Sequence, residues 1–88
     1  MKIKGRFVVR DIAGDTVIVP VGETALQYNG MITTNKTGAV LWQALENGTN
    51  TDSLVQLLME KFEVDLETAS ADVKAFLEQM EKAGLLEN

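Results

Sequence analysis

The sequence contains neither cysteine nor histidine among its 88 residues. These absences exclude disulfides, thiolate nucleophiles and imidazole bases, and they remove the side chains that hold nearly every zinc or iron site. The remaining candidates for chemistry are carboxylates, Ser53, Ser70 and Tyr28, and no pair of them has a spacing typical of acid–base or nucleophilic catalysis. We therefore expect a non-catalytic protein with no metal site and no cofactor.

The chain also lacks a long apolar run. Its longest, residues 17–21, includes the only proline and is too short to span a bilayer. The basic N-terminus is not followed by the apolar core of a signal peptide, so we expect a cytoplasmic protein with no membrane partner. A hydrophobic content of 45% with 24% charged residues is typical of folded proteins, and the length predicts one domain over residues 1–88.

Positive charge is scarce in the second part of the chain. Residues 1–34 carry four basic and three acidic side chains, whereas residues 35–88 carry four lysines against ten carboxylates, a net charge of −6. An acidic surface repels phosphate backbones and tolerates basic or neutral peptides. The charge pattern therefore favours a peptide partner over a nucleic acid.

The first part of the chain has the pattern of β-strands. Residues 6–12 and 16–21 are rich in β-branched and aromatic side chains, and the turn between them contains Gly14 and Asp15, which predicts a tight hairpin. Pro20 lacks an N–H group, so it should lie near the end of its strand or on an unpaired edge.

A third short strand is predicted over residues 31–34. The segment before it, residues 22–30, fits either a helical turn or a second hairpin closed by Asn29-Gly30. Side chains alternate between the two faces of a strand. Ile32 and Thr34 should therefore share one face, and Met31 and Thr33 the other.

Helical periodicity replaces this alternation from Lys36 onward. The first predicted helix runs to about Glu46, with Asn35 as its N-cap and Gly48 as a left-handed C-cap. Trp42, the only tryptophan, is predicted to be a core residue, because a large aromatic side chain in a small domain usually packs inside.

Two more helices are predicted. One begins with Thr51 as its N-cap, and the other, capped by Asp65, runs from Leu66 to about Ala83 before Gly84. The short connection after the first helix is typical of a helix-turn-helix. The predicted buried positions are Leu54, Val55, Leu58 and Phe62 in one helix, Leu66, Ala69, Val73, Phe76, Leu77 and Met80 in the other, and Leu85 and Leu86 folding back as a clasp.

These elements carry motifs in a recognisable order. They are Thr34-Asn35-x-Thr37-Gly38-x-x-x-Trp42-x-x-Leu45 with Gly48, then Ala71-Asp72-Val73-x-Ala75-Phe76-Leu77, then Met80-x-x-x-Gly84-Leu85-Leu86. Together they resemble the PqqD family of pyrroloquinoline-quinone biosynthesis and, more broadly, the domains that recognise ribosomally made, modified peptides. The resemblance covers roughly residues 6 to 86. One departure is Thr34, where the family usually has leucine.

The resemblance implies an α+β fold that is winged-helix-like, with a three-stranded antiparallel sheet followed by three helices. It also implies a peptide chaperone, which binds the leader segment of a precursor peptide and presents it to a modifying enzyme such as a radical S-adenosylmethionine enzyme. The leader would add as a strand to the third strand and rest against the third helix.

Carried over by residue, the resemblance places the peptide on one strand and one helix border. Asp72 is favoured because it belongs to the Ala-Asp-Val motif yet lies too deep in the helix to cap it. The implied peptide-binding residues are Met31, Ile32, Thr33 and Thr34 on the strand and Asp72, Phe76 and Gln79 on the helix, with Lys74, Leu77 and Glu81 as the alternative border.

Two other functions fit the same elements. A winged-helix fold suggests a DNA-binding protein as one alternative. The second helix, however, carries only Lys61 against Asp52 and Glu60, so it cannot neutralise the phosphates of DNA. The other alternative is a purely structural subunit of a maturation enzyme. It differs from a leader-binding protein in that it would not bind leader peptide without the enzyme.

Overall fold

The computed structural model describes residues 1–28 and 30–87. The chain forms two compact units, which we call the sheet unit (Gly5–Ala39) and the helical unit (Met1–Lys4 with Val40–Asn88). The prediction of an α+β fold with a three-stranded antiparallel sheet and three long helices is confirmed. That residues 1–88 act as one domain stays a prediction.

The sheet unit is built on three antiparallel strands in the order β2-β3-β4. They are β2 (Phe7–Ile12), β3 (Asp15–Pro20) and β4 (Ile32–Thr34), so β2 and β4 are the two edges. Pro20 is the last residue of β3, as its missing N–H predicts.

The hairpin between β2 and β3 turns one residue earlier than predicted. Ala13 and Gly14 are the loop residues, with φ of 52° and 87°, and Asp15 already pairs with Ile12. A two-residue loop with both φ positive matches the twist of paired strands, and that match outweighs the modest strain of a left-handed alanine. The prediction that Asp15 is a turn residue is therefore wrong.

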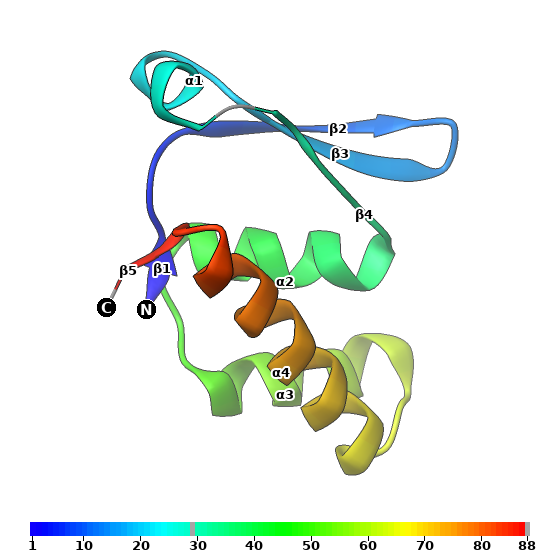
Figure 1. Ribbon diagram of the computed structural model, residues 1–88. Coiled ribbons are helices and arrows are strands. Elements are labelled where there is room, and N and C mark those ends of the chain that lie inside the picture. The colour runs from blue at the N-terminus through cyan, green and yellow to red at the C-terminus, as the bar shows by residue number, and fades with distance from the viewer. Residues whose placement is uncertain (29, 88) are drawn as a thin grey trace. The chain divides into compact units, whose positions relative to one another are not determined.

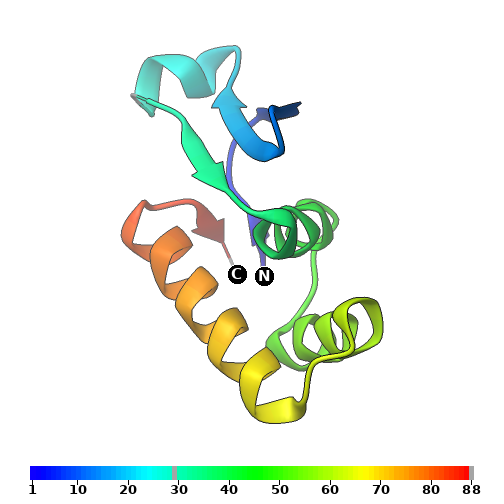
Figure 2. The same ribbon diagram turned by 90° about the vertical axis from the view of Figure 1, so that its right-hand side faces the viewer.

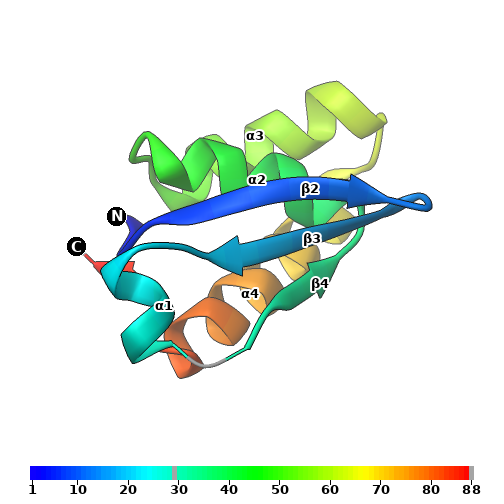
Figure 3. The ribbon, with the colours of Figure 1, turned by 90° about the horizontal axis from the view of Figure 1, so that it is seen from above.

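A short helix, α1 (Glu23–Gln27), connects β3 to β4. Of the two alternatives for residues 22–30, the helical turn is therefore present. The other alternative, a hairpin closed by Asn29-Gly30, lies outside the described residues. The Thr24 hydroxyl accepts a hydrogen bond from the Arg6 N–H over 2.8 Å. Tyr28 contacts Phe7 edge to face, with ring centroids 5.9 Å apart. Figure 3 shows α1 at the end of the sheet opposite the β2–β3 turn.

Three long helices follow, namely α2 (Lys36–Glu46), α3 (Thr51–Phe62) and α4 (Leu66–Lys82). The start of α3 differs from the prediction: Asn50 is its N-cap, accepting the Ser53 N–H over 2.8 Å, and Thr51 is the first helical residue. Asn is a better N-cap than Thr, and Asn50 has the extended backbone that a cap needs. The predicted caps Asn35 and Asp65 are confirmed, accepting N–H groups over 2.9 and 2.8 Å.

The core of the helical unit follows the predicted apolar stripes. Trp42 is fully buried, as predicted, whereas Leu66 is 60% exposed, because the first turn of α4 projects it into solvent. Helices α3 and α4 pack against each other. The buried apolar residues of this unit are Ile3, Leu41, Trp42, Leu45, Leu54, Leu58, Ala69, Val73, Phe76, Met80 and Leu85, while Val55, Phe62 and Leu77 are half-buried.

A second, two-stranded sheet joins the chain ends. β1 (Lys2–Ile3) pairs antiparallel with β5 (Leu86–Glu87), and the Lys4 N–H donates to the Leu85 carbonyl over 2.7 Å. Figures 1 and 2 show β1 and β5 side by side. The predicted C-terminal clasp is confirmed, and it is a paired strand. No described helix is long and apolar enough to cross a membrane.

Candidate functional site

The edge strand β4 forms the sheet half of the predicted peptide site. It pairs with β3 on one side, in a register that places Thr16 opposite Thr34, Val17 opposite Thr33 and Ile18 opposite Ile32. Since the sheet order ends at β4, its other side has no strand partner in the described chain. Such an edge presents backbone N–H and C=O groups in a row.

The hairpin determines which backbone groups of β3 point toward β2. The loop is closed by the pair Ile12 and Asp15, and the Val21 N–H donates to the Arg6 carbonyl over 3.0 Å. Hydrogen-bonded pairs alternate with non-bonded pairs along antiparallel strands. The backbone groups of odd-numbered β3 residues therefore face β2, and those of even-numbered residues face β4.

This alternation determines the orientation of β4 in turn. Thr16 and Ile18 direct their backbone groups at β4, so their partners Thr34 and Ile32 are hydrogen-bonded to β3. Thr33, between them, points its N–H and C=O away from β3 and out from the sheet edge. Of the residues in β4, Thr33 is thus the one whose backbone is directed toward an added strand.

The side chains of the predicted strand residues divide between two faces. Ile32 is only 7% exposed and Thr34 is half-buried, so both lie on the buried face of the sheet, where Ile18 also lies. Thr33 is exposed on the other face, and Met31 is 63% exposed just before the strand. Side-chain contact with a partner along this edge is therefore available at Met31 and Thr33.

A tight contact limits the length of β4. Asn35 follows the strand and caps α2 through the Gly38 N–H. Gly38 is buried against Thr34, and a Cβ built on Gly38 would overlap the Thr34 hydroxyl. The chain therefore passes from strand to helix within one residue, which restricts the edge to a short segment.

The predicted helix residues lie along one strip of α4, one turn apart. Asp72 and Gln79 are exposed, whereas Phe76 is 7% exposed and belongs to the core of the helical unit. On the alternative border, Lys74 and Glu81 are exposed and Leu77 is half-buried. The strand residues belong to the sheet unit and these residues to the helical unit. A site formed by both sets stays a prediction.

Charge on α4 is mostly uncompensated by ion pairs. Within residues 1–28 and 30–87 the one ion pair joins Lys2 Nζ to Glu87 Oε1 over 3.7 Å, so the Asp72 carboxylate makes none.

At the start of α4, hydrogen bonding from the Thr68 backbone N–H, and secondarily from its hydroxyl, lowers the pKa of Asp65.

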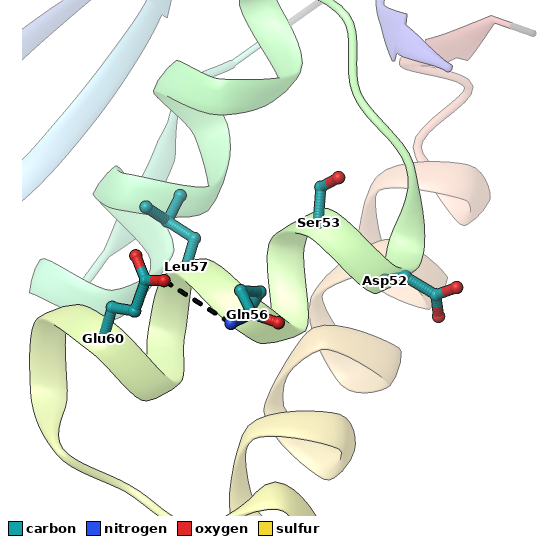
Figure 4. Close-up of a pocket in the computed structure, with 5 residues that line it drawn as sticks. All are labelled: Asp52, Ser53, Gln56, Leu57 and Glu60. Atoms are coloured by element: carbon teal, nitrogen blue, oxygen red, sulfur yellow. Dashed lines mark hydrogen bonds between the residues drawn. The ribbon is translucent and has the colours of Figure 1, made fainter.

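The described surface also has a shallow pocket on α3, which the sequence did not indicate. It has a volume of about 340 Å³, and Gln56 Nε2 donates to Glu60 Oε1 over 3.4 Å within it. Figure 4 shows its lining side chains along a single helix. The residues that line the pocket are Asp52, Ser53, Gln56, Leu57 and Glu60. Across the described residues no acidic side chains cluster in a way that could hold a metal ion.

Comparison with known protein families identifies the family of the chain. Residues 15–86 match the family model described as "Coenzyme PQQ synthesis protein D (PqqD)". The chain belongs to the PqqD family. The match begins at β3 and ends in β5, so it includes both the β4 edge and α4.

Solved structures with the same fold extend this result. The PqqD-family chain is similar to TbiB1 in complex with the TbiA(beta) leader peptide, with a TM-score of 0.74 and 24% identity, over 100% of this chain and 96% of that chain. It is also similar to lasso peptide synthetase B1 complexed with the leader peptide, with a TM-score of 0.70 and 18% identity, over 99% and 96% of the two chains. At these identities the likeness shows the fold. No curated protein matches the sequence.

Proposed function

We propose that this PqqD-family protein binds the leader segment of a ribosomally synthesised precursor peptide and presents it to a modifying enzyme, without catalysing a reaction itself. The observation that carries the proposal is the orientation of Thr33, whose backbone N–H and C=O point out from an edge strand. Family membership supports it, as do two proteins of the same fold that were solved with leader peptides.

Strand addition at β4 explains how a leader would be held. Main-chain hydrogen bonds supply affinity that is independent of sequence, and pockets for alternate side chains supply specificity. With three residues in β4 and one of them directed outward, the ladder is short. Side-chain contacts must therefore contribute, and the exposed thioether of Met31 is suited to an apolar leader residue beside Thr33.

The helix part of the proposed site would supply polar contacts. Asp72 and Gln79 are exposed on one strip of α4, and the Asp72 carboxylate makes no ion pair within the described chain. A lysine or arginine of the leader could pair with it, and such charge-assisted hydrogen bonds are stronger than neutral ones. The α4 contribution should therefore depend on the charge of the leader.

The first experiment tests the outward orientation of Thr33. Thr33→Pro deletes one N–H group, which points away from β3, so the bonds between β3 and β4 should survive. We expect circular dichroism to show a retained fold, and binding of a fluorescein-labelled synthetic leader peptide to weaken by about 1–3 kcal/mol. Thr33→Val keeps the N–H and should bind normally.

A proline on the opposite edge is the matched control. The same alternation directs the backbone of Asp11 outward from β2, so Asp11→Pro deletes an equivalent backbone donor at the other side of the sheet. It also removes the carboxylate that accepts a hydrogen bond from the Thr16 hydroxyl over 3.1 Å, so circular dichroism must show that this variant is folded. Leader affinity should be unchanged in this variant. Equal loss of binding in both proline variants, or in neither, would contradict pairing at β4.

The same titrations test α4. Asp72→Ala should weaken binding more for a leader that carries lysine or arginine than for a neutral analogue, and Glu78→Ala, with the same charge change elsewhere on α4, should not discriminate between them. Amide chemical shifts confined to residues 36–62, with normal binding by every variant, would place the leader elsewhere. No binding to the wild-type protein without an enzyme would favour the purely structural subunit.

A further inference from the structure

The sheet has a second, exposed face, and the leader proposal uses only its β4 margin, where the Thr33 side chain lies beside Val17. Alternation along the paired strands places Val8, Arg10 and Ile12 of β2 on this face together with Asp15, Val17 and Val19 of β3. Ile12 is 58% exposed, Arg10 and Asp15 are exposed, and the three valines are half-buried. We call these six residues the exposed sheet face, which consists of four aliphatic side chains and two opposite charges.

The two charges form no ion pair within residues 1–28 and 30–87. In the part of the chain that the structure describes, Lys2 and Glu87 form the single ion pair, so neither Arg10 nor Asp15 takes part in one. Both charges lie among aliphatic neighbours on a largely apolar face. A complementary surface would therefore need an acidic group, a basic group and an apolar centre in one arrangement.

The strand register gives this arrangement a particular symmetry. Arg10 lies opposite Val17 and Ile12 lies opposite Asp15. The four side chains therefore mark the corners of a rectangle about 5 Å by 7 Å, with the two charges on one diagonal and the two aliphatic residues on the other. The face is thus complementary to itself.

We propose that the exposed sheet face pairs with the same face of a second copy of this chain. A two-fold axis between the stacked faces, running roughly along the line from Ile12 to Val17, brings each aliphatic residue over its own equivalent. The same axis places Arg10 of each copy over Asp15 of the other, which forms two identical ion pairs. Sheets stacked face to face lie about 10 Å apart, within reach of an arginine and an aspartate.

Charge permits this contact in spite of the acidic sequence. The chain has a net charge of −5, but the sheet unit carries three basic and three acidic residues and is neutral. At physiological ionic strength, exposed charges further apart than about 8 Å are largely screened. Repulsion between two copies is therefore weak at this face, and the local charges attract.

Size limits the strength of the contact. The two strands of six residues that form the exposed sheet face cover about 10 by 20 Å, which is smaller than the roughly 800 Å² per partner of a stable interface. The dimer should be weak, with Kd in the range of about 0.1–1 mM. Stacking uses the face and leaves the β4 edge open, so each copy could still hold a leader.

Sedimentation velocity from about 10 μM to 1 mM tests the dimer across the expected Kd range. The wild-type chain should shift from monomer toward dimer over this range. Arg10→Glu and Asp15→Arg should each raise Kd roughly tenfold, because each replaces two attractions by two repulsions. The double variant Arg10→Glu/Asp15→Arg restores opposite charges and should dimerise like the wild type.

Two controls separate this result from other effects. Lys36→Glu makes the same charge change as Arg10→Glu but lies on α2, so it should leave Kd unchanged. Circular dichroism checks that each variant is folded, and leader titration of Arg10→Glu should give wild-type affinity, because the β4 edge is unaltered. A wild-type chain that stays monomeric at 1 mM, or single variants that the double variant does not rescue, would overturn the proposal.

Discussion

At the scale of single residues, the junction between β4 and α2 depends on two small residues, Thr34 and Gly38. Thr34 ends the strand, and Gly38 in the first turn of the helix is buried against it. The sequence indicates that Thr34 replaces a leucine that is usual in the family, which removes one apolar contact. The structure adds that position 38 has no room for a methyl group beside this threonine.

This contact leads to a prediction about Gly38→Ala. Alanine is favoured over glycine inside a helix by about 1 kcal/mol, so propensity alone would stabilise the variant. The added Cβ would overlap the Thr34 hydroxyl, and its next nearest neighbours, at 3.0 and 3.1 Å, are also atoms of Thr34. We expect a net loss of about 1–3 kcal/mol in unfolding free energy, measured by urea denaturation.

The double variant Thr34→Ala/Gly38→Ala distinguishes steric overlap from other causes. Thr34→Ala removes the hydroxyl group that the new Cβ would overlap and the methyl group at 3.1 Å, and it leaves only the Cβ of residue 34 at 3.0 Å, so the second substitution should then cost much less than it does in the wild type. A strongly non-additive cycle is the expected result. A Gly38→Ala protein that is more stable than the wild type would show that Thr34 moves aside at little cost.

At the scale of elements, the sequence predicts helices well because their signals are local. Asn35 and Asp65 are each followed by an apolar period of 3.6, and both cap as predicted. Asn50 and Thr51 are adjacent and both are good caps, and the modest preference for Asn over Thr does not by itself exclude Thr51. The choice depends on which backbone is extended, and that property appears only in the folded chain.

Strand pairing was less predictable, because its partners are distant in sequence. The pairing of β1 with β5 joins the two ends of the chain, and two-residue strands are too short to have a local sequence pattern that predicts it. The candidate site shows the same limit. The sequence predicts β4 and the faces of its side chains, but the outward backbone of Thr33 follows from the registers of β2 with β3 and of β3 with β4, which no local pattern specifies.

The cap of α4 leads to a prediction about pH. Hydrogen bonding from Thr68 to the Asp65 carboxylate lowers the pKa of Asp65 from its ordinary 3.8. The folded protein thus binds this proton less tightly than the unfolded chain. The stabilisation by the charged cap is therefore complete above the ordinary pKa, and it is lost as the pH falls below about 4 through the lowered value.

A comparison with Asp65→Asn isolates this effect. Asparagine keeps a cap oxygen but has no titrating group, and the other carboxylates cancel when the two proteins are compared. In urea denaturation, the wild type should be the more stable protein at pH 6, and the difference should shrink toward pH 3. A stability difference that does not change with pH would contradict a titrating cap.

At the scale of the whole molecule, charge is divided between the two units. The sheet unit is neutral, whereas the helical unit carries five lysines against ten carboxylates. Large exposed hydrophobic side chains are divided in the opposite sense: among the described residues, Ile12, Leu26 and Met31 belong to the sheet unit and Leu66 belongs to the helical unit. We therefore expect protein and peptide contacts to favour the sheet unit and the helical surface to repel anions.

This division predicts how the protein behaves toward DNA. Helices α2 and α3 are joined by residues 47–50, a connection typical of a helix-turn-helix, so connectivity alone would suggest a duplex in contact with α3. Affinity for a duplex depends on neutralising phosphates. On α3 the single cation Lys61 is outnumbered by Asp52 and Glu60. We expect no binding of a fluorescent 20-base-pair duplex, measured by anisotropy at about 0.15 M salt.

A charge-reversed protein makes that negative result informative. Asp52→Lys with Glu60→Lys converts the exposed side of α3 from acidic to basic without touching its buried Leu54 and Leu58. This variant should acquire weak binding that disappears as salt is raised, because each phosphate contact releases a counterion. The assay is then shown to detect such contacts. Binding of the same duplex by the wild-type chain, weakening with salt, would instead establish a nucleic-acid surface that the net charge of the helical unit argues against.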